Sequence, residues 1–173
     1  MNLLHIYDNL SVCDVNEFEN KLFLTYENEW LGKINQLPKL RLYNSIKTNF
    51  KTENYLEMNI SKSQRSILAQ FRCGILPIRI ETGRYKGEPL DERICNFCVL
   101  NEIEDESHFL LNCTIYSDFR RELFNNIGYN PTLVMSNLDC IFFLLSNFPR
   151  QTSKYLIESY LYRQSLLYKK RNA

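Results

Sequence analysis

The sequence contains little glycine, proline or histidine, and these shortages exclude several classes of protein. Five glycines and five prolines among 173 residues are too few for a collagen-like or low-complexity chain. Hydrophobic residues make up 45% of the chain and the net charge is only +1, which excludes intrinsic disorder. No apolar run approaches the roughly 18 residues that a membrane-spanning helix needs, so we expect no membrane partner. The sequence therefore predicts a folded chain with a substantial hydrophobic core.

The first ten residues, MNLLHIYDNL, also lack the features of a secretion signal. No basic region precedes their apolar residues, and no small-residue cleavage site follows. We therefore expect an intracellular protein, in the nucleus or the cytoplasm.

The near-zero net charge conceals four blocks of alternating sign. Residues 1–32 carry −5, residues 33–86 carry +8, residues 87–122 carry −6 and residues 123–173 carry +4. Two interpretations are open. The blocks pair with one another in the fold, or the +8 block, which is interleaved with aromatic residues, binds a polyanion such as nucleic acid.

Apolar periodicity predicts a mainly α-helical fold. Asp14 with Glu17 and Ser61 with Gln64 form capping boxes that begin two of the helices, Ser136 is expected to cap another, and Gly128 is expected to end the helix before it. The apolar stripe of the first helix is expected to face a core. Helices are predicted over 15–36, within 39–60, over 61–74, over 115–127, over 136–149 and from 153 onward. Residues 78–81 alternate like a short strand, and residues 82–89 are expected to form a loop with turns at Gly83 and Gly87.

Four potential metal ligands stand close together in the middle of the sequence. Cys95, Cys98, His108 and Cys113 follow the pattern C-x2-C-x9-H-x4-C. Structural zinc sites use four Cys or His ligands in a tetrahedron, supplied in closely spaced pairs. A complete set of four leaves no position for a water, so the pattern predicts a structural zinc ion and not a catalytic one.

Other roles for the cysteines stay open at this point. In one alternative, three cysteines are simply buried and reduced beside an unrelated histidine: Cys95, Cys98 and Cys113. In another, Cys95 and Cys98 form a redox pair. Three disulfides are disfavoured without a secretion signal. The other cysteines, Cys13, Cys73 and Cys140, are expected to be small buried hydrophobes. The acidic run 102–106 is expected to be a solvated loop that leads into a helix near Asp105.

Several segments around these ligands together resemble one family. They are a basic helix (QRSI to FR, 64–72), an IETGRY turn (80–85), an ERICxxC segment (92–98) and an ESHFLLxC helix (106–113). Over residues 39–125 the chain resembles the zinc-binding region downstream of the reverse transcriptase in non-LTR retrotransposon polyproteins. The resemblance implies a zinc-stabilised, RNA- or DNA-binding appendage with zinc on Cys95, Cys98, His108 and Cys113. Because the chain has no Tyr-x-Asp-Asp polymerase motif and no endonuclease motif, we expect a separated, truncated or domesticated piece of such an element.

These observations combine into one predicted organisation. The fold is expected to be a mainly α helical domain with a small inserted zinc knuckle, made of a short hairpin plus a helix. An N-terminal helical segment occupies 1–38, and basic helices with the zinc-binding module occupy 39–128. C-terminal helices packed on the same core occupy 129–173.

The leading functional hypothesis is a non-catalytic module that binds RNA or DNA. Phosphate contacts come from long cationic side chains and stacking from aromatic ones. The candidates in the +8 block are Lys47, Lys51, Lys62, Arg65, Arg72, Arg79, Arg84 and Lys86 for phosphates, and Tyr85 for stacking.

Two alternatives belong to other classes. A zinc-stapled protein-interaction module is suggested by the apolar stretch 153–168, which would bind a protein partner through the C-terminal helix. An enzyme is disfavoured because His5 is the one histidine left once His108 is a ligand, and the acids Asp118, Glu122, Asp139 and Glu158 are scattered.

Overall fold

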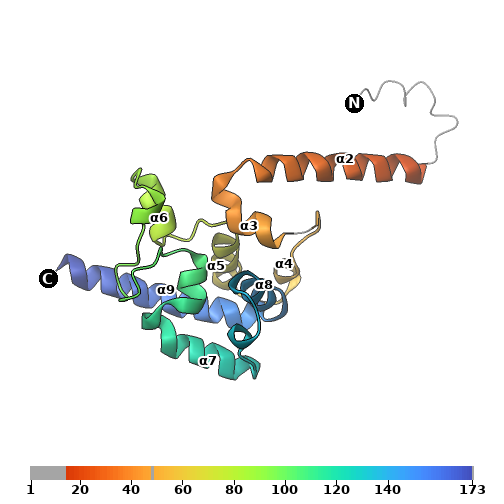
Figure 1. Cartoon of the computed structure of the whole chain (residues 1–173). Coiled ribbons are helices and arrows are strands. Elements are labelled where there is room, and N and C mark those ends of the chain that lie inside the picture. The colour runs from red at the N-terminus through yellow and green to blue at the C-terminus, as the bar shows by residue number, and fades with distance from the viewer. Residues whose placement is uncertain (1–14, 48, 173) are drawn as a thin grey trace. The chain divides into compact units, whose positions relative to one another are not determined.

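The computed structural model of the chain describes residues 15–47 and 49–172 (Figure 1). The predicted capping role of Asp14, and the predictions for Cys13 and His5, lie outside these residues. The chain divides into two units, residues 1–38 and 39–173. Within the described residues, no helix has both the length and the apolar character that crossing a bilayer requires.

The first unit contains one long helix, α2 (Val15–Asn35), which confirms the predicted helix over 15–36. Ion pairs one turn apart, such as Lys21–Glu17 at 2.6 Å, run along its surface. The expectation that its apolar stripe forms a core is wrong. Ile34 is buried, but Val15 and Tyr26 are 69% and 58% exposed.

The second unit is mainly α-helical, as predicted. Its helices are α3 (Arg41–Ile46), α4 (Asn54–Glu57), α5 (Lys62–Arg72), α6 (Arg79–Tyr85), α7 (Ser117–Ile127), α8 (Asn137–Asn147) and α9 (Pro149–Arg171). Short turns precede or link them: η1 (Pro38–Leu40), η2 (Leu90–Glu92), η3 (His108–Asn112), η4 (Thr114–Tyr116) and η5 (Pro131–Leu133). In the described residues the one β-type pairing is an isolated antiparallel bridge between Ile94 and Ile103.

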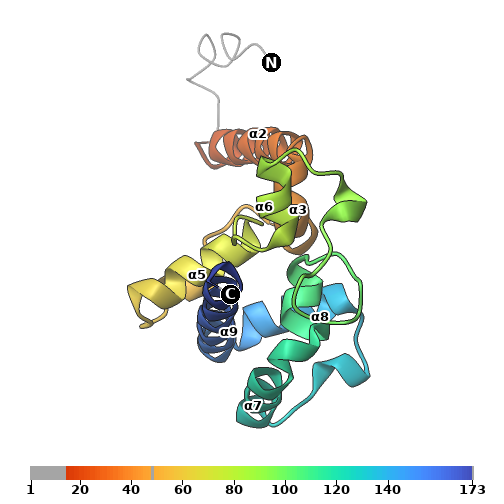
Figure 2. The same cartoon turned by 90° about the vertical axis from the view of Figure 1, so that its left-hand side faces the viewer.

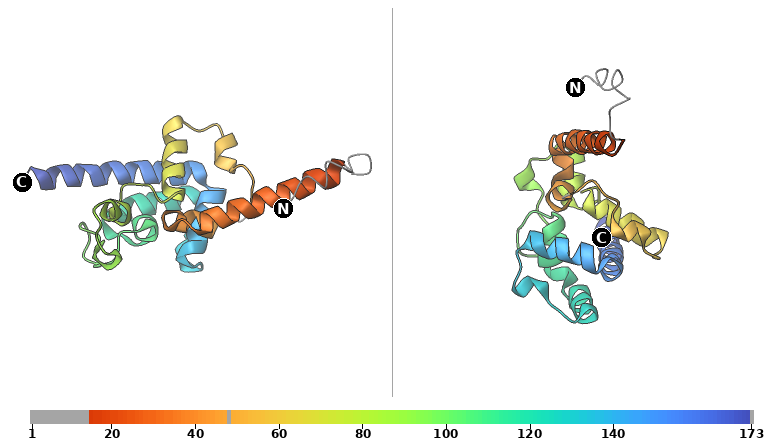
Figure 3. Two further views of the ribbon diagram at one scale, coloured as in Figure 1. Left: turned by 90° about the horizontal axis from the view of Figure 1, so that it is seen from above. Right: turned by 90° about the vertical axis from the view of Figure 1, so that its right-hand side faces the viewer.

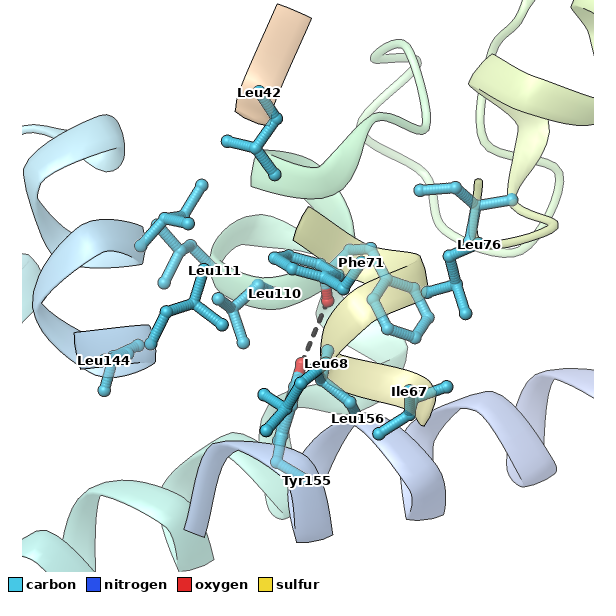
Figure 4. Packing of buried hydrophobic residues seen from close by; sticks show 14 of the residues in the cluster. Leu42, Ile67, Leu68, Phe71, Leu76, Leu110, Leu111, Leu144, Tyr155 and Leu156 are labelled. Carbon is cyan, nitrogen blue, oxygen red and sulfur yellow. Dashed lines mark hydrogen bonds between the residues drawn. The ribbon is translucent and has the colours of Figure 1, made fainter. Parts of the chain in front are cut away.

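Helix α9 is the scaffold of this unit, because α5, α7 and α8 all pack on it (Figures 1 and 2). Its C-terminal half extends past α5 and α8 (Figure 3). The core that joins these helices contains Leu68 and Phe71 of α5, Leu110 of η3, Leu144 of α8 and Leu156 of α9, all fully buried (Figure 4).

Local signals placed several helix ends correctly. Ser61 caps α5 as predicted: its hydroxyl accepts from the N–H of Gln64, whose side chain accepts from the N–H of Ser61. Ser136 caps α8 through its hydroxyl, which accepts from the Asp139 N–H and donates to the Asp139 carboxylate, and Gly128 ends α7 with a positive φ of 68°. The last helix begins at Pro149 instead of near residue 153.

The predicted strand over 78–81 is wrong, and the loop predicted over 82–89 is wrong at residues 82–85, because residues 79–85 form α6. Residues 86–89 lie outside the helix, and Gly87 makes the predicted turn with a positive φ of 71°. Ile78 and Ile80 are both buried, so their alternation reflects burial of a helix start and not a sheet. Gly83 lies inside α6 and does not make a turn. A Cβ at Gly83 would lie 2.6 Å from the Glu88 carboxylate and 2.7 Å from the Arg93 side chain, so the glycine allows close packing.

Candidate metal centre

The fold brings all four predicted metal ligands together. One ligand atom from each of Cys95, Cys98, His108 and Cys113 lies within 4.8 Å of the others. Three of the four residues are buried and Cys98 is partly buried. We call this set the Cys3His cluster.

The spacing of the cluster fits the geometry of zinc. A tetrahedral ion with Zn–S bonds of about 2.3 Å separates two sulfurs by roughly 3.8 Å, and a sulfur from a histidine nitrogen by roughly 3.6 Å. The Cys95 and Cys113 sulfurs lie 3.9 Å apart, and the Cys98 sulfur lies 3.4 Å from Nε2 of His108. The cluster could therefore hold a metal ion such as zinc.

A short hairpin positions the first two ligands. Cys95 N–H donates to the Glu102 carbonyl at 2.8 Å, and Glu104 N–H donates to the Arg93 carbonyl at 3.0 Å. These bonds flank the Ile94–Ile103 bridge and close the loop that carries Cys98. The predicted hairpin thus exists as two hydrogen bonds and one bridge.

A π-helical turn positions the other two ligands. In an α-helix, residues five apart are about 140° apart around the axis, so His108 and Cys113 would point in different directions. In η3 the Cys113 N–H instead donates to the His108 carbonyl at 2.8 Å, five residues back. This wider turn lets both side chains face the same point. Turns of this π-helical type are frequently found at functional sites.

Glu102 orients the histidine. Its carboxylate lies 2.9 Å from Nδ1 of His108, which directs Nε2 toward the sulfurs. Metal-bound histidines usually donate their second nitrogen to a carboxylate in this way. The prediction of a solvated acidic run gave Glu102 no such role, although an acid six residues before the histidine is a usable signal.

The expectation that the acidic run 102–106 is solvated is wrong at two positions. Glu104 is fully buried: its carboxylate accepts from Arg163 at 2.7 and 2.9 Å and from the Arg79 N–H at 2.8 Å. Glu106 is buried and paired with Arg41, and burial raises its pKa. Asp105 caps the turn before His108 as expected, accepting from the His108 N–H at 2.7 Å. The run is therefore structural, because each buried acid meets an arginine from another element.

Other contacts tie the cluster to the helices around it. Tyr155 of α9 donates its hydroxyl to the Phe109 carbonyl at 2.9 Å, the dashed line in Figure 4. Arg120 of α7 donates to the Leu110 and Cys113 carbonyls at 2.9 and 2.7 Å. Arg93 donates to the Ile80 carbonyl of α6 at 3.1 Å. The hairpin and η3 are therefore held on α6, α7 and α9.

Hydrogen bonds within the cluster shift the pKa values of two of its thiols and of its imidazole. The hydrogen bond from Cys113 lowers the pKa of Cys95 and raises that of Cys113, because the two thiols share a proton. Burial opposes protonation of His108, but hydrogen bonds to Cys95 and Glu102 outweigh it and raise its pKa to about 9. The described cysteines form no disulfide. Cys140 is fully buried and Cys73 partly buried, which agrees with their predicted roles as small hydrophobes.

Many of the predicted phosphate-binding residues have acidic partners inside the fold. Lys47 and Arg72 are buried, and each forms a 2.6 Å ion pair with Glu53, so neither is exposed to solvent as a phosphate contact would require. Arg79 pairs with Glu88 at 2.8 Å, and Arg84 with Glu81 at 2.8 Å. The pairs with Glu53 and Glu81 lie within the +8 block, whereas Arg79–Glu88 joins two charge blocks, as do Arg41–Glu106 and Arg163–Glu104.

The rest of the predicted nucleic-acid-binding set lies at the surface. Lys51, Lys62 and Lys86 are exposed. Arg65 is partly buried and donates to the Ile60 carbonyl at 2.6 Å. Tyr85 is 71% exposed, and the Arg84 guanidinium lies 4.6 Å from its ring centre.

These features define a helical protein with a Cys3His cluster suggestive of a zinc site. No known family, no curated protein and no solved structure matched the chain when it was compared with them.

Proposed function

We propose that the Cys3His cluster holds one structural zinc ion. The observation that supports this is the convergence of four soft or borderline donors, spaced as a tetrahedral ion requires. Cys95 and Cys98 from the hairpin, with His108 and Cys113 from η3, would hold the ion. When bound, zinc cross-links these two segments and leaves no open ligand position.

The test is the metal content of the purified full chain. One zinc per chain is expected, together with a large fall in melting temperature when a strong chelator removes it. A chain without stoichiometric zinc, whose melting curve a chelator leaves unchanged, would refute the proposal.

We further propose that this zinc-stabilised unit is a non-catalytic, retrotransposon-derived module that binds RNA or DNA. The resemblance of residues 39–125 supports it, since the four ligands of that pattern come together in space. The exposed cations Lys51, Lys62 and Lys86 and the exposed Tyr85 ring also support it.

A salt series tests the nucleic-acid proposal. We expect the affinity for short oligonucleotides to fall as salt rises from about 50 to 200 mM, with a log–log slope that reflects several phosphates. Binding that does not change over this range would contradict it.

A second candidate is a module that binds a protein partner through α9. Leu161 and Tyr168 of this helix are 63% and 72% exposed, whereas Tyr155 and Leu156 are buried in the core. Exposed apolar residues on an otherwise packed helix are typical of contact surfaces. Self-association in light scattering that Leu161→Gln and Tyr168→Gln abolish, without oligonucleotide binding by the native chain, would favour this candidate.

A further inference from the structure

A pocket of about 410 Å³ lies between α6, the hairpin that carries Cys95 and Cys98, and the C-terminal half of α9. Figure 1 shows α6 and this part of α9 on the same side of the second unit, and Figure 2 shows both from that side. Ligand pockets in proteins span roughly 300–1,000 Å³, so this one has room for a group of about one nucleotide.

The charged residues that line the pocket are all cationic. They are Arg79 and Lys86 from α6 and its end, and Arg163 and Arg171 from α9. Lys86 and Arg171 are exposed, and no salt bridge engages either of them in the described part of the chain. The pocket is therefore a place of uncompensated positive charge, which attracts anions.

The other two cations of the pocket, Arg163 and Arg79, differ in how fully their acidic partners engage them. Arg163 is neutralised by the buried Glu104 and so contributes shape more than charge. Arg79 is shared with Glu88, but its Nε is buried and has no hydrogen-bond partner among the described residues. The guanidinium also donates to the Glu92 carbonyl at 3.2 Å, so an anion in the pocket would supply the acceptor that Nε lacks.

Aromatic and neutral polar groups complete the lining. Phe97 and Tyr160 supply flat apolar surface, and the Arg163 guanidinium lies 5.2 Å from the centre of the Phe97 ring. Thr82, Asn96 and Gln164 supply neutral hydrogen-bonding groups. Cations, amides and aromatic rings without a carboxylate match the chemistry of a nucleotide, which has an anionic phosphate, a flat base and polar base edges.

We propose that this pocket binds one nucleotide of a single-stranded RNA or DNA. Lys86, Arg171 and Arg79 contact the phosphate, and the base packs against the Phe97 and Tyr160 side of the pocket. A single strand is required because the bases of a duplex are already stacked on one another and present no free face. The proposal rests on the nucleic-acid function proposed above and assigns it to a site that, apart from Arg79 and Lys86, the sequence did not indicate.

The test is fluorescence anisotropy of the zinc-loaded full chain with labelled oligonucleotides of about 12 nucleotides. Three probes are compared: a thymidine single strand, a duplex of the same length, and a base-free strand of the same charge. The pocket variant is Lys86→Glu with Arg171→Glu. The control is Arg121→Glu with Lys154→Glu, which changes the net charge equally at two exposed residues that neither line the pocket nor belong to the candidate nucleic-acid-binding set.

We expect the native chain to prefer the thymidine strand over the duplex and over the base-free strand by about tenfold. The pocket variant should bind the thymidine strand at least about tenfold more weakly, with its salt slope reduced by about 0.7, the value for one phosphate contact on a single strand. The control variant should lose much less affinity.

Other outcomes separate the two proposals. If the native chain binds but the control variant is weakened as much as the pocket variant, or if duplex is preferred, the pocket is wrong and nucleic-acid binding stands. Equal affinity for the base-free strand would overturn the base contact. If the native chain binds none of the probes, both proposals fail. Zinc content and melting temperature of each variant, measured alongside, exclude loss of folding as the cause.

Discussion

Helix α2 and the segment 94–113 are almost equal in length but opposite in construction. Helix α2 has 21 residues of regular backbone, yet Ile34 is its one buried residue. The segment 94–113 has one bridge and one π-helical turn, yet it buries Glu104, His108 and Cys113. Regular hydrogen bonding therefore does not decide where this chain is packed. Side-chain partners decide which segments are buried. Arginines pair with the buried acids, and the four ligands lie against one another.

The largest effect should follow from removing a ligand of the Cys3His cluster. Cys113→Ser is expected to abolish stoichiometric zinc and to destabilise the second unit by more than about 5 kcal/mol, because zinc supplies about 10 kcal/mol or more in zinc-dependent domains. Metal analysis and chemical unfolding measure both effects. Cys140→Ala, at an equally buried cysteine outside the cluster, should keep its zinc.

The next effect concerns the buried pair between the segment and α9. Glu104→Gln leaves the Arg163 charge buried without its partner, and we expect a loss of about 3–5 kcal/mol in the free energy of unfolding. Adding Arg163→Met should recover part of that loss. The control Glu122→Gln breaks an exposed pair with Lys154 and should change stability little. A loss no greater than that of the control would show that the pair does not hold the segment.

A smaller effect should come from the carboxylate that orients the histidine. Glu102→Gln keeps an acceptor for Nδ1 of His108 but removes its charge, so zinc affinity should fall about 10- to 100-fold while the fold is retained. Competition with a chelator of known affinity measures this. Glu92→Gln removes one exposed negative charge nearby and serves as the matched control.

Zinc affinity should also depend on pH, with a sign set by His108. Its pKa is raised to about 9, so at neutral pH the metal-free imidazole is protonated and must release a proton to bind zinc. We therefore expect affinity to rise by at least about tenfold per pH unit from about pH 7 toward 9, since at least one proton is displaced. An NMR titration of His108 in metal-free protein should show a midpoint well above 6.5. Affinity that does not change with pH would contradict this assignment.

The smallest effect is expected in α2. Leu24 is 55% exposed, and Leu24→Gln should change the free energy of unfolding by no more than about 0.5 kcal/mol. Leu110 in η3 is fully buried, and Leu110→Ala should cost about 2–5 kcal/mol. Similar losses from the two substitutions would erase the contrast between the two regions.

Patterns within one element predicted well. Capping at Ser61 and Ser136 and the break at Gly128 depend on neighbouring residues, so they can be recognised in the sequence alone. The stripe of α2 misled because apolar periodicity shows that a helix has a face but not that anything covers it. The strand predicted over 78–81 failed because buried alternation over four residues fits a helix start equally well.

The sequence by itself determined the helical class, several helix ends and the identity of the four candidate ligands, since each depends on residue type and short spacing. Only the tertiary structure decided which charges are available. The fold buries three cations: Lys47, Arg72 and Arg163. Ion pairs with Glu53 neutralise the first two, and an ion pair with Glu104 neutralises Arg163. Some of the residues that surround these cations are far from them in sequence. The pocket that Lys86 and Arg171 line could not be predicted either, because it joins elements about 85 residues apart whose approach depends on the packing of α9.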